Sequence, residues 1–177
     1  MIVSKKGLII AAAIPIVIAL VIAIPKISPG SEQAAVSAAT QLRIEFMKED
    51  MKRVIFGVTE TIGAQKSEKL IINNNGDAIY NLSIEGEKGS QTRFKVSSVE
   101  VKRLKSLIVD TGFMQIPKSE FALKDDATEF TRYTLKVSLD SNTKSIQWFN
   151  EEASKEFVPA LLVMLADEMQ KIIKAHE

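Results

Sequence analysis

Residues Thr131–Trp148, which read TRYTLKVSLDSNTKSIQW, carry the clearest structural signal in this sequence. Apolar side chains stand at every second position of its first half: Tyr133, Leu135, Val137 and Leu139. That two-residue period is typical of a strand with one buried face. Asp140-Ser141-Asn142 has the composition of a tight turn, and Ile146 and Trp148 continue the alternation beyond it. The stretch therefore predicts an antiparallel hairpin with Trp148 in the core.

A second hairpin is predicted upstream, where Asn75-Gly76 supplies two residues that tolerate positive φ. The strand before it is expected at Leu70–Asn73, and the strand after it buries Tyr80, Leu82 and Ile84. Two earlier alternating runs also predict strands: Val54, Phe56 and Val58 form one, and Leu42, Ile44 and Phe46 form the other. For the Leu42 run a longer helix fits nearly as well.

An amphipathic helix is predicted over Ser98–Asp110. Ser97 and Glu100 have the spacing of a capping box, and Gly112 stands where a helix of this length ends. The expected apolar stripe consists of Val101, Leu104, Leu107 and Ile108. The expected solvent-facing side chains are Lys102, Arg103 and Lys105.

A second helix is predicted over Val158–Ala175, with Pro159 tolerated in its first turn. Its expected core face consists of Leu161, Leu162, Leu165, Met169, Ile172 and Ile173. Val163 and Met164 fall outside that stripe, so the helix is either buried on more than one side or offers an apolar edge to another subunit. A loop is expected between the two helical regions, from Ile116 to Glu129.

The fold class that these elements predict is α+β: an N-terminal transmembrane helix followed by an antiparallel sheet packed against two amphipathic helices. The predicted divisions are an anchor over residues 1–26, a linker and juxtamembrane segment over 27–51, and a soluble α+β domain over 52–177. Within the linker, Ser31 is a plausible N-cap for a short alanine-rich helix.

The anchor rests on residues 7–24, GLIIAAAIPIVIALVIAI, which contain no charged side chain. Eighteen residues of helix reach about 27 Å, close to the hydrocarbon thickness of a bilayer, so this run is expected to contact membrane lipid. A cleaved signal peptide is the competing interpretation, but its apolar region would be shorter and a small-residue cleavage site would follow. Lys5 and Lys6 before the span, against Lys26 after it, place the N-terminus in the cytoplasm and the domain outside.

Charge and composition exclude several classes of function. The chain carries a net charge of +1, and Lys5, Lys6 and Lys26 are the only charged side chains before Glu32. The remainder is therefore slightly acidic, which argues against nucleic acid as a partner. Cysteine is absent, so thiolate catalysis, disulfides and cysteine-ligated metal centres are excluded.

Segments Arg93–Pro117 (RFKVSSVEVKRLKSLIVDTGFMQIP) and Thr131–Trp148, between an earlier hairpin and a closing helix, resemble a group of uncharacterised prokaryotic domains. Members of that group look like small secreted or membrane-anchored α+β proteins, several of them archaeal. The resemblance extends from about Lys52 to Ala175 and rests on structural features of the sequence: a capped helix, a Gly-Phe exit and an alternating strand. It implies the fold and the extracytoplasmic setting, and it carries over no catalytic residue.

The candidate chemical groups are few. Asp125, Asp126 and Glu129 gather in one loop, but their spacing does not match a calcium-binding loop, and a solvated loop is favoured over a metal site. His176, the single histidine, stands beside the C-terminus and is expected to be solvated. Met47 and Met51 could share a helical face and bind copper(I), although core packing explains such a pair better.

Two further motifs have structural explanations. Asn73–Asp77 offers oxygen ligands, but hairpin chemistry accounts for it. Asn81-Leu82-Ser83 is a glycosylation sequon on the outward side of its strand. The sequence therefore predicts no catalytic, cofactor-binding or metal-binding residue, and no cofactor.

The function predicted is a non-catalytic, membrane-tethered interaction protein of the cell envelope, with a membrane or envelope protein as partner. One alternative is an accessory subunit of a larger membrane enzyme complex, since Ala11–Ala13 and Pro15 permit close helix packing. The other is a metal-assisted hydrolase built on Asp125, Asp126 and Glu129, which requires those carboxylates to converge in a pocket.

Overall fold

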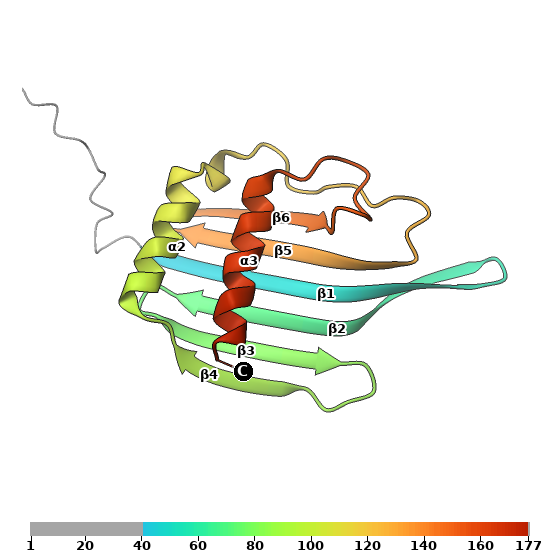
Figure 1. Cartoon of the computed structure of the whole chain (residues 1–177), viewed down its shortest axis with the longest axis horizontal. Helices are drawn as coiled ribbons and strands as arrows, with labels where there is room; N and C mark the ends of the chain where they lie inside the picture. The colour runs from blue at the N-terminus through green and yellow to red at the C-terminus, as the bar shows by residue number, and fades with distance from the viewer. Residues whose placement is uncertain (1–40, 177) are drawn as a thin grey trace, which may run out of the picture. The chain divides into compact units, whose positions relative to one another are not determined.

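The computed structural model describes residues 41–176, so the predicted span and the predicted helix at Ser31 lie outside the described residues. The described chain forms a six-stranded antiparallel sheet with two α-helices on one face (Figure 1). The strands are β1 Leu42–Phe56, β2 Thr59–Asn73, β3 Asp77–Ile84, β4 Ser90–Lys95, β5 Glu129–Leu139 and β6 Asn142–Phe149. The helices are α2 Ser98–Asp110, the short 3-10 helix η2 Phe113–Gln115, and α3 Ala160–Lys174. The predicted α+β class with an antiparallel sheet and two helices is confirmed.

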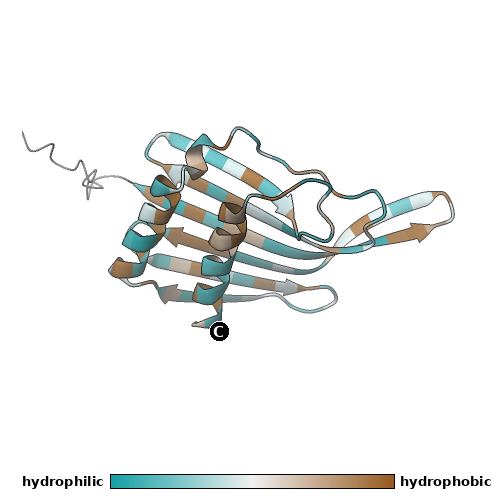
Figure 2. Ribbon diagram, turned by 45° about the horizontal axis from the view of Figure 1, so that its top comes forward, coloured by the Kyte–Doolittle hydropathy of each residue, from teal (hydrophilic) through white to brown (hydrophobic). Residues whose placement is uncertain are grey.

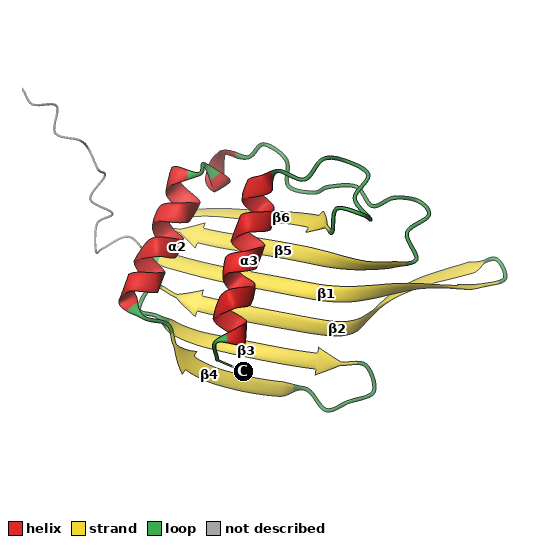
Figure 3. Cartoon of the chain, viewed as in Figure 1, coloured by secondary structure: helices red, strands yellow, loops and turns green. Residues whose placement is uncertain are grey.

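β1 is a central strand, because the strand order is β4-β3-β2-β1-β5-β6. Phe46 lies opposite Leu70 of β2 on one side and opposite Leu135 of β5 on the other. Strands β1 to β4 follow one another as hairpins, and the chain then crosses by α2, η2 and a long loop to reach β5 (Figure 3). The predicted loop from Ile116 to Glu129 corresponds to this crossing, which holds only isolated bridges at Glu120 and Leu123.

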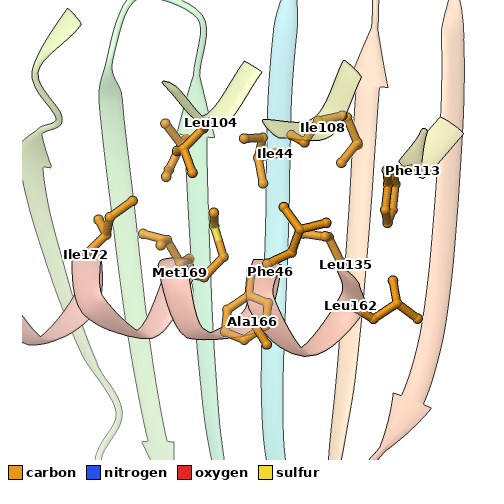
Figure 4. Packing of buried hydrophobic residues seen from close by; sticks show 14 of the residues in the cluster. Ile44, Phe46, Leu104, Ile108, Phe113, Leu135, Leu162, Ala166, Met169 and Ile172 are labelled. Atoms are coloured by element: carbon orange, nitrogen blue, oxygen red, sulfur yellow. The ribbon is translucent and has the colours of Figure 1, made fainter. Parts of the chain in front are cut away.

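The hydrophobic core lies between the sheet and the helices. Alternate residues of β1 and β5 point from the sheet toward α2 and α3, and Figure 4 shows Ile44, Phe46 and Leu135 meeting Ile108 and Met169. Trp148 is buried in the same cluster, as predicted. The expected core face of α3 is confirmed, since Leu162, Leu165, Met169, Ile172 and Ile173 are buried and Leu161 packs against them.

The helix ends that the capping residues predicted agree with the structure to within two residues at α2 and at the start of α3. The Ser97 side chain accepts a hydrogen bond from the Glu100 N–H at 3.2 Å, and Glu100 Oε2 accepts one from the Ser97 N–H at 3.2 Å, so the capping box is present. Gly112 follows the cap residue Thr111 with φ 75° and ends α2. At α3, Pro159 is the N-cap residue, so the helix begins two residues later than predicted.

The domain boundary at Lys52 was wrong, because residues 42–51 are the first two thirds of β1 and hold Leu42, Ile44 and Phe46 in the core. The helical alternative for this run is excluded with it. Residues Val54 and Phe56 belong to the same strand, whereas Val58 lies in the following turn. β4 was not predicted, because its residues SQTRFK show one apolar side chain and no alternation.

The sequence predicted that two side chains, Lys105 and His176, are solvated, but one is buried and the other is partly buried. Lys105 of α2 is only 6% exposed. His176 is partly buried: its ring stacks on Phe94 of β4 with centroids 4.1 Å apart, and its Nδ1 lies 2.9 Å from the Ile172 carbonyl. This stack places the end of the chain after α3 against β4.

The opposite face of the sheet is covered with charge over much of its area. Glu45 of β1 forms ion pairs with Arg43 at 3.1 Å, Lys136 at 3.7 Å and Lys69 at 3.8 Å. A small second cluster of Met51, Phe130, Phe149 and Ala153 packs at the end of β5. Within residues 41–176, no helix is both long enough and apolar enough to cross a bilayer.

Candidate functional site

The β1–β2 hairpin extends beyond the rest of the sheet (Figure 1). β5 accompanies β1 only as far as Lys52, and β3 accompanies β2 only from Lys66 onward. Residues 53–62 therefore pair only with each other in a two-stranded ribbon, and we call residues 53–64 the arm. One backbone hydrogen bond, from the Arg53 N–H to the Thr128 carbonyl at 2.7 Å, ties its base to the neighbouring loop.

The arm exposes large apolar side chains at its end (Figure 2). Phe56 is 72% exposed and Val58, in the turn beside Gly57, is fully exposed. Ile55 and Ile62 are exposed as well. The only charged side chains within residues 53–64 are Arg53 and Glu60, and they pair with each other at 3.1 Å. The arm thus has no net charge and both of its edges lack a strand neighbour.

Register distributes these apolar side chains over both faces of the arm. Ile55 lies opposite Glu60 and Arg53 opposite Ile62, so Ile55 and Ile62 share a face. Phe56, one residue further along, points to the other face. An isolated ribbon with two apolar faces has no core of its own to cover it, so these side chains are available to another surface.

A second surface lies beside α3 on the helix-bearing face of the sheet. A cavity of about 650 Å³ opens between α3 from Ala160 to Lys171, the loop from Asn150 to Val158, and residues of β5 and β6. We call it the α3 groove and define it by Tyr133, Trp148, Phe157, Val163, Met164 and Asp167. Val163 and Met164, the residues outside the main apolar stripe, are exposed along its wall, so burial of α3 on this side is excluded for the described residues.

Aromatic rings form the floor of the α3 groove. Tyr133 stacks on Trp148 with ring centroids 5.6 Å apart, and on Phe46 at 6.3 Å. Burial of the phenol, together with the negative charges of Asp50, Asp167 and Glu68, raises the pKa of Tyr133 above its ordinary value. The hydroxyl therefore stays protonated at neutral pH and remains a hydrogen-bond donor.

Carboxylates surround the mouth of the groove. Glu156 pairs with Lys118, and Glu168 pairs with Arg103 and, at 2.8 Å, with Lys171. Within residues 41–176, Asp167 and Glu151 have no ion pair, although both line the cavity. The lining also includes Gln170, whose Nε2 is buried and has no hydrogen-bond partner in the described part of the chain. The groove has the size of a ligand-binding site, but among its lining residues no nucleophile forms a hydrogen bond with a general base.

The predicted carboxylate cluster does not assemble. Asp125 is exposed and pairs with Lys155 at 3.3 Å, whereas Glu129 pairs with Lys52 at 3.1 Å on β1. Asp126 is also exposed. Across residues 41–176 no three acidic or histidine side chains lie close enough to hold a metal ion. Within residues 41–176, the three carboxylates therefore do not form the metal centre that the hydrolase alternative requires.

The other candidate residues have structural positions. Met47 and Met51 lie on a strand and not on a helix, and Met51 packs with Phe130 and Phe149. Asn81 of the sequon lies on the face away from the helices and accepts a hydrogen bond from Gln91 Nε2 at 2.9 Å. Asn75 turns the β2–β3 hairpin, where its Oδ1 accepts from the Asp77 N–H at 3.0 Å.

Sequence reasoning missed the arm, and of the α3 groove it found only the apolar edge at Val163 and Met164. The run Val54–Val58 was interpreted as a buried strand, because alternation does not tell whether anything covers the strand. The pairing of β5 with β1 ends at Lys52 and the pairing of β3 with β2 ends at Lys66, and this loss of the outer neighbours becomes visible only in the sheet register. Comparison with models of protein families and with curated proteins finds no match for this chain, so the resemblance to the uncharacterised prokaryotic domains stays a prediction.

Proposed function

We propose that this chain is a non-catalytic, membrane-tethered interaction protein of the cell envelope, and that the arm is the element that contacts its partner. The observation that carries the proposal is the exposure of Ile55, Phe56, Val58 and Ile62 on a ribbon that projects from the sheet. Large apolar side chains concentrated at one exposed place mark interaction sites in soluble domains. Unpaired strand edges are otherwise an aggregation hazard, so a partner that covers them accounts for their presence.

The position of the arm favours a protein partner. The tip lies at the opposite end of β1 from Leu42, where the chain enters the sheet, and fifteen residues of strand span about 50 Å. Lysine and tryptophan, which typically flank a membrane-inserting loop, are absent from residues 53–64, and the single arginine there, Arg53, is paired with Glu60.

The tether rests on residues 7–24, whose eighteen uncharged residues have the length of a membrane span. An alkaline carbonate wash of membranes tests it. The full chain is expected in the pellet, and a chain without residues 1–26 in the supernatant. Release of the full chain would exclude an integral span. Protease added to intact cells tests the proposed orientation, in which the domain is outside and is digested.

The interaction is tested by a photo-crosslinking amino acid placed at Val58 in the full chain. A matched control carries the same amino acid at Lys88, an exposed position in the β3–β4 turn, which lies at the same end of the strands as the arm but on a different hairpin. We expect a discrete adduct from position 58, none from position 88, and loss of the adduct when Phe56→Ser is added. Equal crosslinking at both positions, or none at position 58, contradicts the role of the arm.

A further inference from the structure

The α3 groove joins an apolar lining to acidic side chains that lack a cation. Trp148, Phe157, Val163 and Met164 contribute the apolar surface. Glu156 and Glu168 are neutralised by Lys118, Arg103 and Lys171, but Asp167 and Glu151 are not neutralised within residues 41–176. An uncharged ligand that covered the apolar lining would leave both Asp167 and Glu151 without a counter-charge.

We propose that the α3 groove binds a segment of a partner protein in which a lysine or arginine side chain adjoins large apolar side chains. The apolar side chains would enter against Tyr133 and Phe157, and the cation would lie beside Asp167. Charge complementarity selects a basic segment over an acidic one, because an acidic segment would add like charge to a mouth that is already negative.

The dimensions and hydrogen-bonding groups favour a peptide over a small amine. The lining follows α3 from Ala160 to Lys171, which is about 16 Å of helix and matches about five residues of extended chain. Asn150, Glu151 and Gln170 add polar side chains to the lining, and a peptide backbone supplies both donors and acceptors for such groups. A single small amine would fill only part of this length.

This inference does not depend on the arm, because no residue within 53–64 lines the α3 groove. The two surfaces are therefore separable by mutation. Phe56→Ser is expected to remove the crosslink from position 58 and to leave peptide binding in the groove unchanged, whereas Asp167→Asn is expected to weaken peptide binding and to leave the crosslink unchanged.

Trp148 makes the test specific, since it is the single tryptophan of the chain and lines the groove. The full chain in mild detergent is titrated with the capped peptide Leu-Lys-Phe-Lys-Leu, its acidic counterpart Leu-Glu-Phe-Glu-Leu, and phenethylamine. Tryptophan emission and the anisotropy of dye-labelled peptides are both recorded, so that binding without an emission change is still detected.

We expect saturable binding of the basic peptide, with at least fivefold weaker binding of the acidic peptide. Asp167→Asn is expected to weaken the basic peptide about two- to fivefold, the range of an exposed ion pair, and added salt is expected to weaken it too. Asp126→Asn, an exposed carboxylate outside the groove, is the matched control and should have no effect.

Several results would overturn the proposal. Equal affinity for the basic and acidic peptides would show that charge does not select the ligand. An Asp167→Asn variant with unchanged affinity would place the cation elsewhere. If phenethylamine binds as tightly as the basic peptide, the site takes a small organic cation and not a protein segment. No saturable binding in either readout would reject the groove as a site for basic, apolar segments.

Discussion

Glu68 shows how a single side chain can be both buried and charged in this sheet. It is only 4% exposed, yet Tyr80 donates a hydrogen bond to its Oε1 at 3.0 Å, and Lys48 and Lys66 pair with it at 3.2 and 3.3 Å. Burial by itself would raise the pKa of this carboxyl. The Tyr80 hydrogen bond and the two lysine charges outweigh that effect, so the pKa is lowered from its ordinary value of 4.5.

Glu68→Gln is expected to reduce the free energy of unfolding by about 1–2 kcal/mol at neutral pH, because it leaves Lys48 and Lys66 without their counter-charge. A lowered folded-state pKa contributes stability above 4.5 and loses it as the pH falls through the folded value. The difference between the wild type and the variant should therefore shrink in acid. Urea unfolding over this pH range measures it, with Glu87→Gln, an exposed residue, as the control. A difference that grows in acid would contradict the assigned pKa direction.

At the scale of elements, the β2–β3 hairpin depends on one glycine. Gly76 has φ 86°, a backbone conformation that residues with a Cβ adopt only at an energetic cost. A Cβ added there would also lie 2.4 Å from the Val96 carbonyl oxygen, which is backbone at the start of the segment that leads into α2. Gly86, in the next turn, has φ 79° and open space around it. Substitutions at Gly86 and Gly76 therefore distinguish the cost of backbone strain alone from the added cost of steric overlap.

We expect Gly86→Ala to cost about 1 kcal/mol from backbone strain alone. Gly76→Ala should cost roughly 2–4 kcal/mol, because overlap with the Val96 backbone adds to that strain. Chemical denaturation of both variants beside the wild type measures the difference. Equal losses for the two alanines would mean that the backbone near Val96 moves away at little cost.

At the scale of the whole molecule, stability depends on β1 being present from its first residue. β1 pairs with β2 over most of its length and with β5 from Leu42 to Lys52, so it joins the two halves of the sheet. Leu42, Ile44 and Phe46 are buried in the core beneath the helices. Together they contribute about 5–9 kcal/mol of hydrophobic free energy, comparable to the entire stability of a domain of this size.

A chain that begins at Gln41 is therefore expected to unfold cooperatively, whereas a chain that begins at Lys52, the boundary that the sequence suggested, is expected not to fold. Far-UV circular dichroism and urea titration of the two chains distinguish these outcomes. A native-like cooperative transition for the shorter chain would show that β1 is dispensable beyond its final residues and that the core closes without Phe46.

The sequence by itself determined the elements whose signals are local. The capping box at Ser97 and Glu100 and the glycine at position 112 fix α2, and the alternation from Tyr133 to Leu139 fixes β5, because each signal acts between residues a few positions apart. The core face of α3 followed from its helical period for the same reason.

Tertiary structure decided which surfaces are covered. The His176 ring is partly buried against Phe94, a residue distant in sequence, and Val58 is exposed because β3 and β5 end before the arm does. The α3 groove likewise joins Tyr133 to Met164, which no local pattern connects. Periodicity shows which side chains share a face, but whether that face meets a core, solvent or a partner depends on strand order and register between remote residues.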